Sequence, residues 1–231
     1  MFARAAAFVA VVMLLLVSMP TTTTTAAADF TPISAPAALA ALRGATAQVM
    51  AFGCNLRSED GTAVAVDGTG LVTNAHVIAA SRTVEVVGDD RPTEVGGGPM
   101  VATAADVATI AVGGPPFAPL VLAPRDPGPG SAVRVAGYPG APIGQIQAGL
   151  TVVATSVVDY IPGAMVDQPG QVMRLAASVQ PGMSGGPVLD ASGRLAGIVF
   201  GDDEASGDAL AIPASQLRRL LAPDSLVPSS C

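Results

Sequence analysis

Ser184 lies in a stretch whose composition could present a nucleophile, residues 180–187 (QPGMSGGP). A serine hydroxyl attacks poorly on its own, so it needs a base within hydrogen-bond reach and N–H donors for the negative charge that its attack creates. Glycines on both sides allow a sharp turn and let a substrate carbonyl approach backbone N–H groups closely. The stretch alone is equally compatible with an ordinary loop, so the rest of the chain must decide.

His76 is the only histidine in the chain, and any imidazole base for Ser184 must therefore be His76. It follows the short apolar segment 71–73, whose end would present it at the rim of a sheet. A lone histidine is more often structural than catalytic, and that alternative stays open at this point.

Asp106 is the best placed carboxylate to orient His76, because it immediately precedes the apolar segment 107–112 and could be buried there. Asp67 belongs to a turn, while Asp89 and Asp90 have the pattern of solvated loop charges. The alternative for Asp106 is a turn residue that begins a strand.

The order of these residues along the chain separates the hydrolase classes. In α/β-hydrolases the histidine follows the serine, but no histidine follows Ser184. The subtilisin order could use Asp60 or Asp67, yet that fold needs alternating strands and long helices, whose patterns are missing. Histidine, aspartate and then serine is the chymotrypsin order, which comes with two β-barrels.

Short segments rich in Val and Ala, separated by Gly, Pro and Asp, favour an all-β fold. We predict two six-stranded antiparallel β-barrels. The strands expected in the first are 46–52, 61–66, 71–73, 83–87 and 107–112, with a hairpin turn at Asp67-Gly68. Those expected in the second are 131–136, 143–158, 171–177, 187–189, 194–200 and 209–212.

Two short helices are expected to flank the barrels. The first covers 34–43, with Ser34 as its cap and Gly44 as its stop. The second is a closing helix with Pro213 in its first turn and Leu217, Leu220 and Leu221 on one face.

The N-terminal segment 1–28 has the pattern of a secretory signal peptide: Arg4, an apolar run and then small residues before Asp29. An uncleaved anchor is the alternative, although the run is shorter than the roughly 20 residues that span a membrane. The predicted organisation is then an extension with a short helix (29–45), a first barrel with His76 and Asp106 (46–122), a second barrel with Ser184 and the closing helix (123–221), and a tail (222–231). We expect a secreted or cell-envelope protein without a stable membrane anchor once the signal is removed.

Composition limits the partners. Half of the 231 residues are hydrophobic, so a sizeable core is available. The formal net charge is −7 and the chain has no lysine, which argues against a nucleic-acid partner. One histidine and two cysteines cannot form a structural zinc site, and we expect no metal or other cofactor.

The two cysteines, Cys54 and Cys231, could form a disulfide in an oxidising compartment, which would tie the end of the chain to the first barrel. The alternatives are a free Cys54 in the core and a terminal Cys231 that cross-links two molecules.

Three motifs together resemble those of bacterial trypsin-like serine peptidases of the HtrA type: residues 73–77 (TNAHV), 106–110 (DVATI) and 182–187 (GMSGGP). Residues 137–140 (GYPG) are similar to a turn common in that group. The likeness covers roughly residues 46–221, and the cysteine placement is most similar to the protease domain of actinobacterial MarP-type acid-resistance proteases.

The resemblance implies a secreted endopeptidase that hydrolyses protein or peptide substrates through His76, Asp106 and Ser184 and an acyl-enzyme intermediate. It also implies an oxyanion hole formed by the N–H groups of Gly182 and Ser184. A specificity pocket would have Ser178 at its base and Phe200, Gly201 and Asp202 along its wall.

Met183 is a departure, because many trypsin-like enzymes carry an aspartate there that pairs with a newly formed N-terminal ammonium. Methionine cannot make that ion pair, so we expect no activation by N-terminal insertion. The alternative function, for which Met183 is the only support, is a weak or inactive protease-like binding module of the cell envelope.

Overall fold

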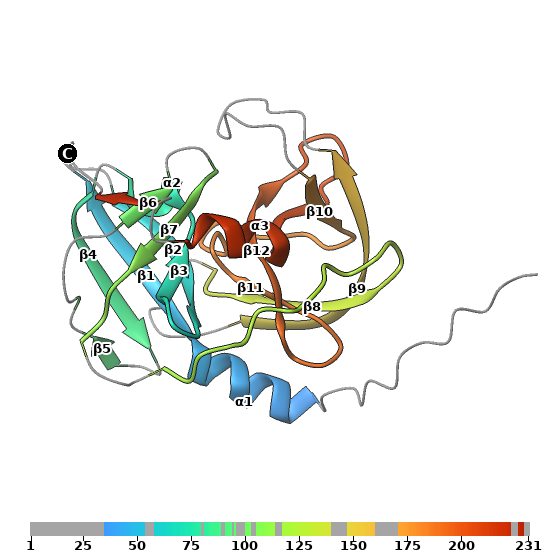
Figure 1. Ribbon diagram of the computed structural model, residues 1–231, viewed down its shortest axis with the longest axis horizontal. Helices are drawn as coiled ribbons and strands as arrows, with labels where there is room; N and C mark the ends of the chain where they lie inside the picture. Colours follow the sequence, from blue (N-terminus) through green and yellow to red (C-terminus); the bar gives the residue numbers. More distant parts are fainter. Residues whose placement is uncertain are drawn as a thin grey trace, which may run out of the picture.

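The computed structural model describes residues 35–53, 58–79, 81–88, 91–93, 95, 100–102, 105–113, 117–139, 147–159, 171–222 and 226–228. These residues form two curled antiparallel sheets that lie side by side, with few helices (Figure 1). The predicted all-β, two-barrel architecture is confirmed.

The first sheet has eight strands in the order β14-β6-β7-β3-β2-β1-β4-β5. Their bounds are β1 Thr46–Gly53, β2 Ser58–Val66, β3 Gly70–Thr73, β4 Ser81–Gly88, β5 Arg91–Thr93, β6 Met100–Ala102, β7 Val107–Ile110 and β14 Val227–Pro228. The sheet has more strands than the six expected. The additional strands are two or three residues long, and such short strands have no alternating pattern that a sequence could reveal.

The second sheet is a closed barrel in the order β10-β13-β12-β11-β8-β9. Its strands are β8 Ala132–Gly137, β9 Gln147–Asp159, β10 Gln171–Leu175, β11 Pro187–Leu189, β12 Leu195–Asp202 and β13 Ala209–Pro213. All six overlap segments predicted to be strands, and β8, β9, β12 and β13 end one or two residues beyond them. Closure pairs every strand on both sides and so leaves no edge strand open to another chain.

Helix α1 (Ala35–Ala45) includes Gly44, so the prediction that Gly44 ends the helix is wrong. Two carbonyl groups of its last turn have one local and one tertiary partner instead of a glycine cap. The Thr46 hydroxyl donates to Leu42 O at 2.7 Å, and the N–H of Ala118 donates to Gly44 O at 2.7 Å. With those carbonyls satisfied, the chain passes directly from the helix into β1. Ser34, the predicted cap, lies outside the described residues.

Helix α3 (Ala214–Leu220) closes the second barrel, and Pro213 is its N-cap rather than a residue of its first turn. The Asp126 carboxylate accepts the N–H of Ser215 at 2.9 Å and so satisfies one of the free donors of the helix start. Leu217 is fully buried.

The two sheets share a core. One hydrophobic cluster combines Val64, Val72 and Val107 of the first sheet with Leu195 and Ile198 of the second. Leu217 of α3, which crosses the middle of Figure 1, belongs to the same cluster. Each sheet also has an apolar cluster of its own. The candidate site therefore lies between two units that are packed against each other.

The segment that joins the sheets bonds to both. The N–H of Leu120 donates to Ala65 O at 2.9 Å, and the N–H of Leu195 donates to Val121 O at 3.0 Å. Single parallel bridges, Val66 with Leu120 and Leu122 with Leu195, continue this pattern. Residues 120–122, at the boundary between the two predicted barrels, thus connect the two sheets.

The end of the described chain returns to the first sheet, where β14 pairs with β6. Cys54 and Cys231 lie outside the described residues, so their pairing stays a prediction, as does the signal peptide. Within the part of the chain that the structure describes, no helix is long and apolar enough to cross a membrane. That same part contains no cluster of three or more His, Cys, Asp or Glu residues that could hold a metal ion.

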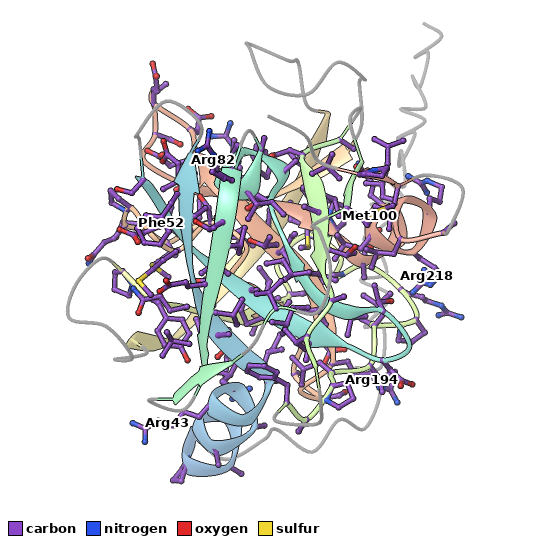
Figure 2. The ribbon with its side chains drawn as sticks, turned by 90° about the vertical axis from the view of Figure 1, so that its left-hand side faces the viewer. Arg43, Phe52, Arg82, Met100, Arg194 and Arg218 are labelled. Atoms are coloured by element: carbon purple, nitrogen blue, oxygen red, sulfur yellow. The ribbon has the colours of Figure 1, made fainter. Side chains whose placement is uncertain are left out.

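Figure 2 shows Arg43 beside α1 and Arg82 near the opposite end of the view, whereas Arg194 and Arg218 lie on the same side of the molecule.

We predict that Leu217→Ala lowers the free energy of unfolding by about 2–5 kcal/mol, because it leaves a cavity in the core shared by the sheets and α3. Leu220→Ala, in the same helix but only partly buried, should cost less. Guanidinium chloride unfolding followed by circular dichroism measures both. Equal losses would show that α3 is not anchored through Leu217.

Candidate active site

His76 and Asp106 meet because the sheet brings their two segments to one end. Strand β3 pairs antiparallel with β7, with Thr73 opposite Ala108. The residues after β3 and the residue before β7 therefore lie together. His76 sits in the one-turn helix α2 (Ala75–Ile78), directly beyond β3.

The His76 ring and the Asp106 carboxylate lie within hydrogen-bond distance of each other. His76 Nδ1 lies 2.8 Å from Asp106 Oδ2 and 3.0 Å from Oδ1, and the backbone N–H of His76 donates to Oδ1 at 2.9 Å. An ionised carboxylate only accepts hydrogen bonds, so Nδ1 carries the proton and Nε2 of a neutral ring has its lone pair free. That is the tautomer a general base needs.

Asp106 is held in an unusual backbone conformation. It is only 5% exposed, and its φ of 52° is the only positive φ of a non-glycine residue among those the structure describes. The left-handed region is uncommon for a residue with a side chain, although Asp tolerates it better than most. Such a conformation persists where the surroundings hold it in place.

Asn74 is one of the groups that hold it. Its side-chain Nδ2 donates to the carbonyl oxygen of Asp106 at 2.9 Å, and Asn74 is fully buried. The sequence does not reveal this role, because the hydrogen bond joins residues 32 positions apart. The structure gives its side chain no capping bond, and its buried Oδ1 has no hydrogen-bond partner among the described residues.

We predict that Asn74→Ala lowers kcat/KM by about five-fold, because a hydrogen bond is worth ~1 kcal/mol and a factor of ten in rate corresponds to ~1.4 kcal/mol. The mechanism would be a looser Asp106. Since His76 is the only histidine, its Nδ1–H proton gives one unambiguous NMR resonance, which should move upfield or broaden. An unchanged resonance with unchanged kcat/KM would contradict this role of Asn74.

The Ser184 loop consists of two successive turns. The N–H of Met183 donates to Gln180 O at 3.0 Å, and the N–H of Gly186 donates to Met183 O at 2.8 Å. Gly185 has φ +84°, and a Cβ there would lie 1.9 Å from the carbonyl oxygen of Thr62. Only glycine allows this loop to approach the first sheet so closely.

Ser184 and Val77, the residue that follows His76, both lie close to Gly61 of β2. Its carbonyl oxygen accepts the N–H of Thr62 at 2.7 Å. A Cβ on Gly61 would lie 2.6 Å from a methyl group of Val77 and 3.3 Å from Ser184 O. No hydrogen bond joins the Ser184 hydroxyl to the His76 ring in the described structure; in unliganded enzymes such a bond is often long and tightens only with substrate.

The N–H groups of Gly182 and Ser184, predicted to form the oxyanion hole, donate to no acceptor among the described residues. Gly182 has φ +93°, a conformation that favours glycine. Both donors are therefore free for a negatively charged oxygen.

Met183 is buried, with 8% of its surface exposed, and it belongs to the apolar cluster of the second barrel. A Cβ on Gly137 would lie 3.1 Å from Met183 Cα and Cγ, and the N–H of Gln180 points to the Met183 sulfur at 3.5 Å. Apolar packing thus fixes the residue before Ser184, which needs no ion pair there.

We predict that Met183→Asp destabilises the loop strongly, because an unpaired buried carboxylate costs several kcal/mol or takes up a proton. Thermal stability and labelling by a fluorophosphonate probe should both fall. Met183→Leu, which conserves volume, should cost less than about 1.5 kcal/mol and keep labelling. A stable, fully labelled Met183→Asp variant would show that packing at this position does not matter.

The residues predicted to line a specificity pocket come from two segments that meet at β13. The N–H of Ala209 donates to Ala177 O at 2.8 Å, next to Ser178, and Ala209 also pairs with Asp202 of β12. Ser178 and Asp202 are exposed, whereas Phe200 and Gly201 are half-buried.

The acidic turn between β12 and β13 is anchored by Arg174 of β10. Its guanidinium pairs with Asp203, donates to Ser206 Oγ at 3.0 Å and lies 3.6 Å from Asp208. The pKa of Asp203 is lowered, mainly by the hydrogen bond from the Ala205 N–H, although burial opposes the shift. The charged form therefore stabilises the turn, and its contribution is lost as the pH falls through that lowered pKa.

A family model described as "Trypsin-like peptidase domain" matches residues 61–198, more than half of the chain. The chain belongs to the trypsin-like peptidase family. Serine protease Rv3671c of Mycobacterium tuberculosis (strain ATCC 25618 / H37Rv) is 34% identical to this peptidase in an alignment of 184 residues that covers 74% of this chain and 45% of that protein. Serine protease MT3772 of strain CDC 1551 / Oshkosh gives the same values. The chain thus spans less than half the length of these relatives.

Solved structures support the family membership. The active form of the Rv3671c protease superposes with a TM-score of 0.72 at 25% identity, covering 84% of this chain and 86% of that one. The HtrA-type protease AlgW with a tripeptide superposes with a TM-score of 0.63 at 21% identity, covering 82% of this peptidase and 64% of AlgW, and so shares the fold. The resemblance to MarP-type proteases, of which Rv3671c is one, is thereby confirmed, and HtrA-type proteases share the fold.

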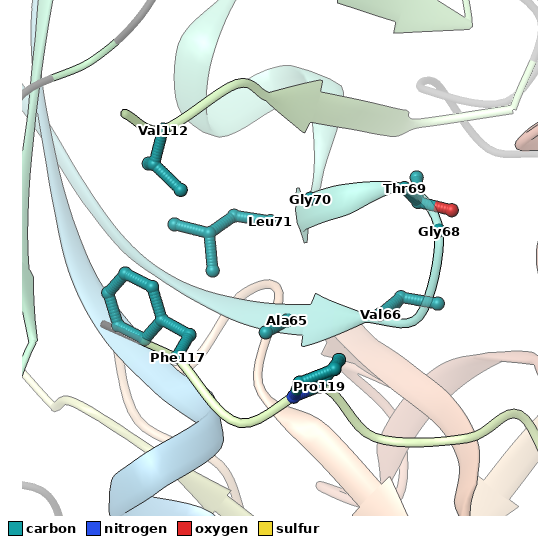
Figure 3. Close-up of a pocket in the computed structure, with 9 residues that line it drawn as sticks. All are labelled: Ala65, Val66, Gly68, Thr69, Gly70, Leu71, Val112, Phe117 and Pro119. Atoms are coloured by element: carbon teal, nitrogen blue, oxygen red, sulfur yellow. The ribbon is translucent and has the colours of Figure 1, made fainter. Parts of the chain in front are cut away.

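The peptidase also has a pocket of about 290 Å³ at the turn between β2 and β3 (Figure 3). It lies at the opposite end of β3 from His76. Its lining is mostly apolar, with Leu71, Val112, Phe117 and Pro119 around it, and contains no titratable side chain. It is therefore separate from the candidate active site.

Proposed function

We propose that this peptidase is a serine endopeptidase in which Ser184 is the nucleophile, His76 the general base and Asp106 the residue that orients His76. The observation that carries this proposal is the buried Asp106 carboxylate bonded to His76 Nδ1, which leaves Nε2 as an acceptor. Ser184 lies on the adjoining loop, tied to the same sheet through Thr62.

In this mechanism the Ser184 hydroxyl attacks a peptide carbonyl while His76 Nε2 takes its proton. Asp106 stabilises the imidazolium that results. His76 then gives the proton to the leaving amine, so that the peptide bond breaks and an acyl-enzyme remains. Water, activated by His76 in the same way, hydrolyses the ester and regenerates Ser184.

The N–H groups of Gly182 and Ser184 receive the oxyanion in both steps. Loss of one such donor typically costs ~10²–10³ in rate. The glycines of the loop therefore matter for rate as well as for the turn, because they leave these donors accessible.

The remaining parts of the proposal concern context. We propose protein or peptide substrates, a substrate site that includes Ser178 and residues 200–202, and a secreted or cell-envelope location after removal of residues 1–28. We also propose that residues 46–122 and 123–221 are the two barrel domains and that Cys54 and Cys231 form a disulfide. The family membership and the similarity to bacterial serine proteases support this setting.

We predict that a fluorophosphonate probe labels the wild-type protein and that labelling disappears in Ser184→Ala, because the probe reacts only with an activated serine. His76→Ala should also abolish labelling. Ser192→Ala, in the turn after β11, is the matched control and should label like the wild type. Folded wild-type protein that does not label would overturn the proposal and favour the protease-like binding module.

A further inference from the structure

We propose that Thr62 is a positioning residue, whose hydroxyl and N–H hold the backbone of the nucleophile loop so that the Gly182 and Ser184 N–H groups stay aimed at the oxyanion. This inference rests on the proposed function. It names a residue of the first sheet as the one that sets the geometry of a site in the second.

The N–H, the hydroxyl and the carbonyl oxygen of Thr62 all form hydrogen bonds. Its N–H donates to Ser184 O at 2.7 Å, and its hydroxyl donates to Gly182 O at 2.8 Å. The same hydroxyl accepts the N–H of Tyr138 at 2.9 Å, and the carbonyl oxygen of Thr62 accepts the Thr73 hydroxyl at 2.7 Å. One residue of β2 thus bonds to β3, to the loop after β8 and twice to the nucleophile loop.

These bonds act on the peptide groups around the oxyanion donors. The carbonyl groups of Gly182 and Ser184 both point at Thr62. Gly182 has no Cβ and a φ of +93°, so its own backbone imposes little restraint. The hydroxyl of Thr62 supplies the missing restraint, because fixing the Gly182 carbonyl limits rotation of the residue that bears one of the two donors.

The surroundings make the hydroxyl hard to replace. Thr62 is fully buried, and Gly182 and Tyr138 are buried as well. A Cβ on Gly137 would lie 3.1 Å from Thr62 Oγ1, and a Cβ on Gly185 would lie 1.9 Å from Thr62 O. The second barrel therefore encloses Thr62 with glycines. A residue without the hydroxyl leaves a buried carbonyl and a buried N–H without this partner.

The test uses Thr62→Val, which keeps the shape and the N–H, and the pair Thr62→Ser and Thr62→Ala, which differ by one hydroxyl. In Thr62→Val we expect kcat to fall about 10- to 100-fold, somewhat less than for loss of a whole oxyanion donor, with KM changed less than about two-fold. Affinity for a peptide boronate, which binds as a tetrahedral adduct, should fall in parallel. Thr62→Ser should have a kcat within about three-fold of the wild type, whereas Thr62→Ala should lose about as much kcat as Thr62→Val.

Thr46→Val is the matched control. Thr46 is equally buried, and its hydroxyl also donates to a backbone carbonyl, Leu42 O, at 2.7 Å. It should lose stability without losing kcat. If Thr62→Val is too unstable to assay, the serine and alanine pair decides the matter at a temperature where both are folded.

The proposal is overturned if Thr62→Val or Thr62→Ala keeps the wild-type kcat, or if Thr46→Val loses as much kcat. These outcomes are distinct from failure of the proposed function. If the proposed function fails, the folded wild type does not react with a fluorophosphonate. If only the Thr62 proposal fails, labelling still depends on Ser184 and is equally fast in the wild type and in Thr62→Val.

Discussion

A buried carboxylate is the constraint on which the rest of this structure depends. Asp106 is almost completely removed from water, and an ionised group in that position is stable only when hydrogen bonds surround it. His76 supplies two, through its ring and its backbone N–H. Asn74 holds the Asp106 carbonyl, so the positive φ that directs the carboxylate towards His76 is kept. The β3–β7 pairing brings all three residues to one end of the sheet.

The second requirement is that the Ser184 loop of the other barrel has one fixed position relative to His76 and Asp106. Apolar packing between the sheets brings the units together, but it is not directional. Hydrogen bonds from Thr62 to the carbonyl groups of Gly182 and Ser184 provide direction. Gly185 lets the backbones approach closely enough for these bonds to form.

Met183 shows how the loop is held from its other side. Trypsin-like enzymes with an aspartate before the nucleophile use an ion pair, whereas here a methionine side chain fills the apolar core of the second barrel. The loop is thus fixed by packing from one barrel and by hydrogen bonds from the other. The Met183 side chain itself offers no carboxylate for a charged chain end. The residue that raised doubt about activity has a structural explanation in the packing of its side chain.

The sequence alone determined the two-barrel fold, most strands and the candidates His76, Asp106 and Ser184, because short apolar segments and the order of a single histidine, an aspartate and a serine along the chain are local or linear properties. It did not reveal the shortest strands or the true end of α1, since Gly44 is satisfied by a tertiary partner. Nor did it reveal Asn74 and Thr62, which are ordinary residues of a helix start and a strand. Only the tertiary structure decided their roles, because each acts through a hydrogen bond to a residue at least 30 positions away.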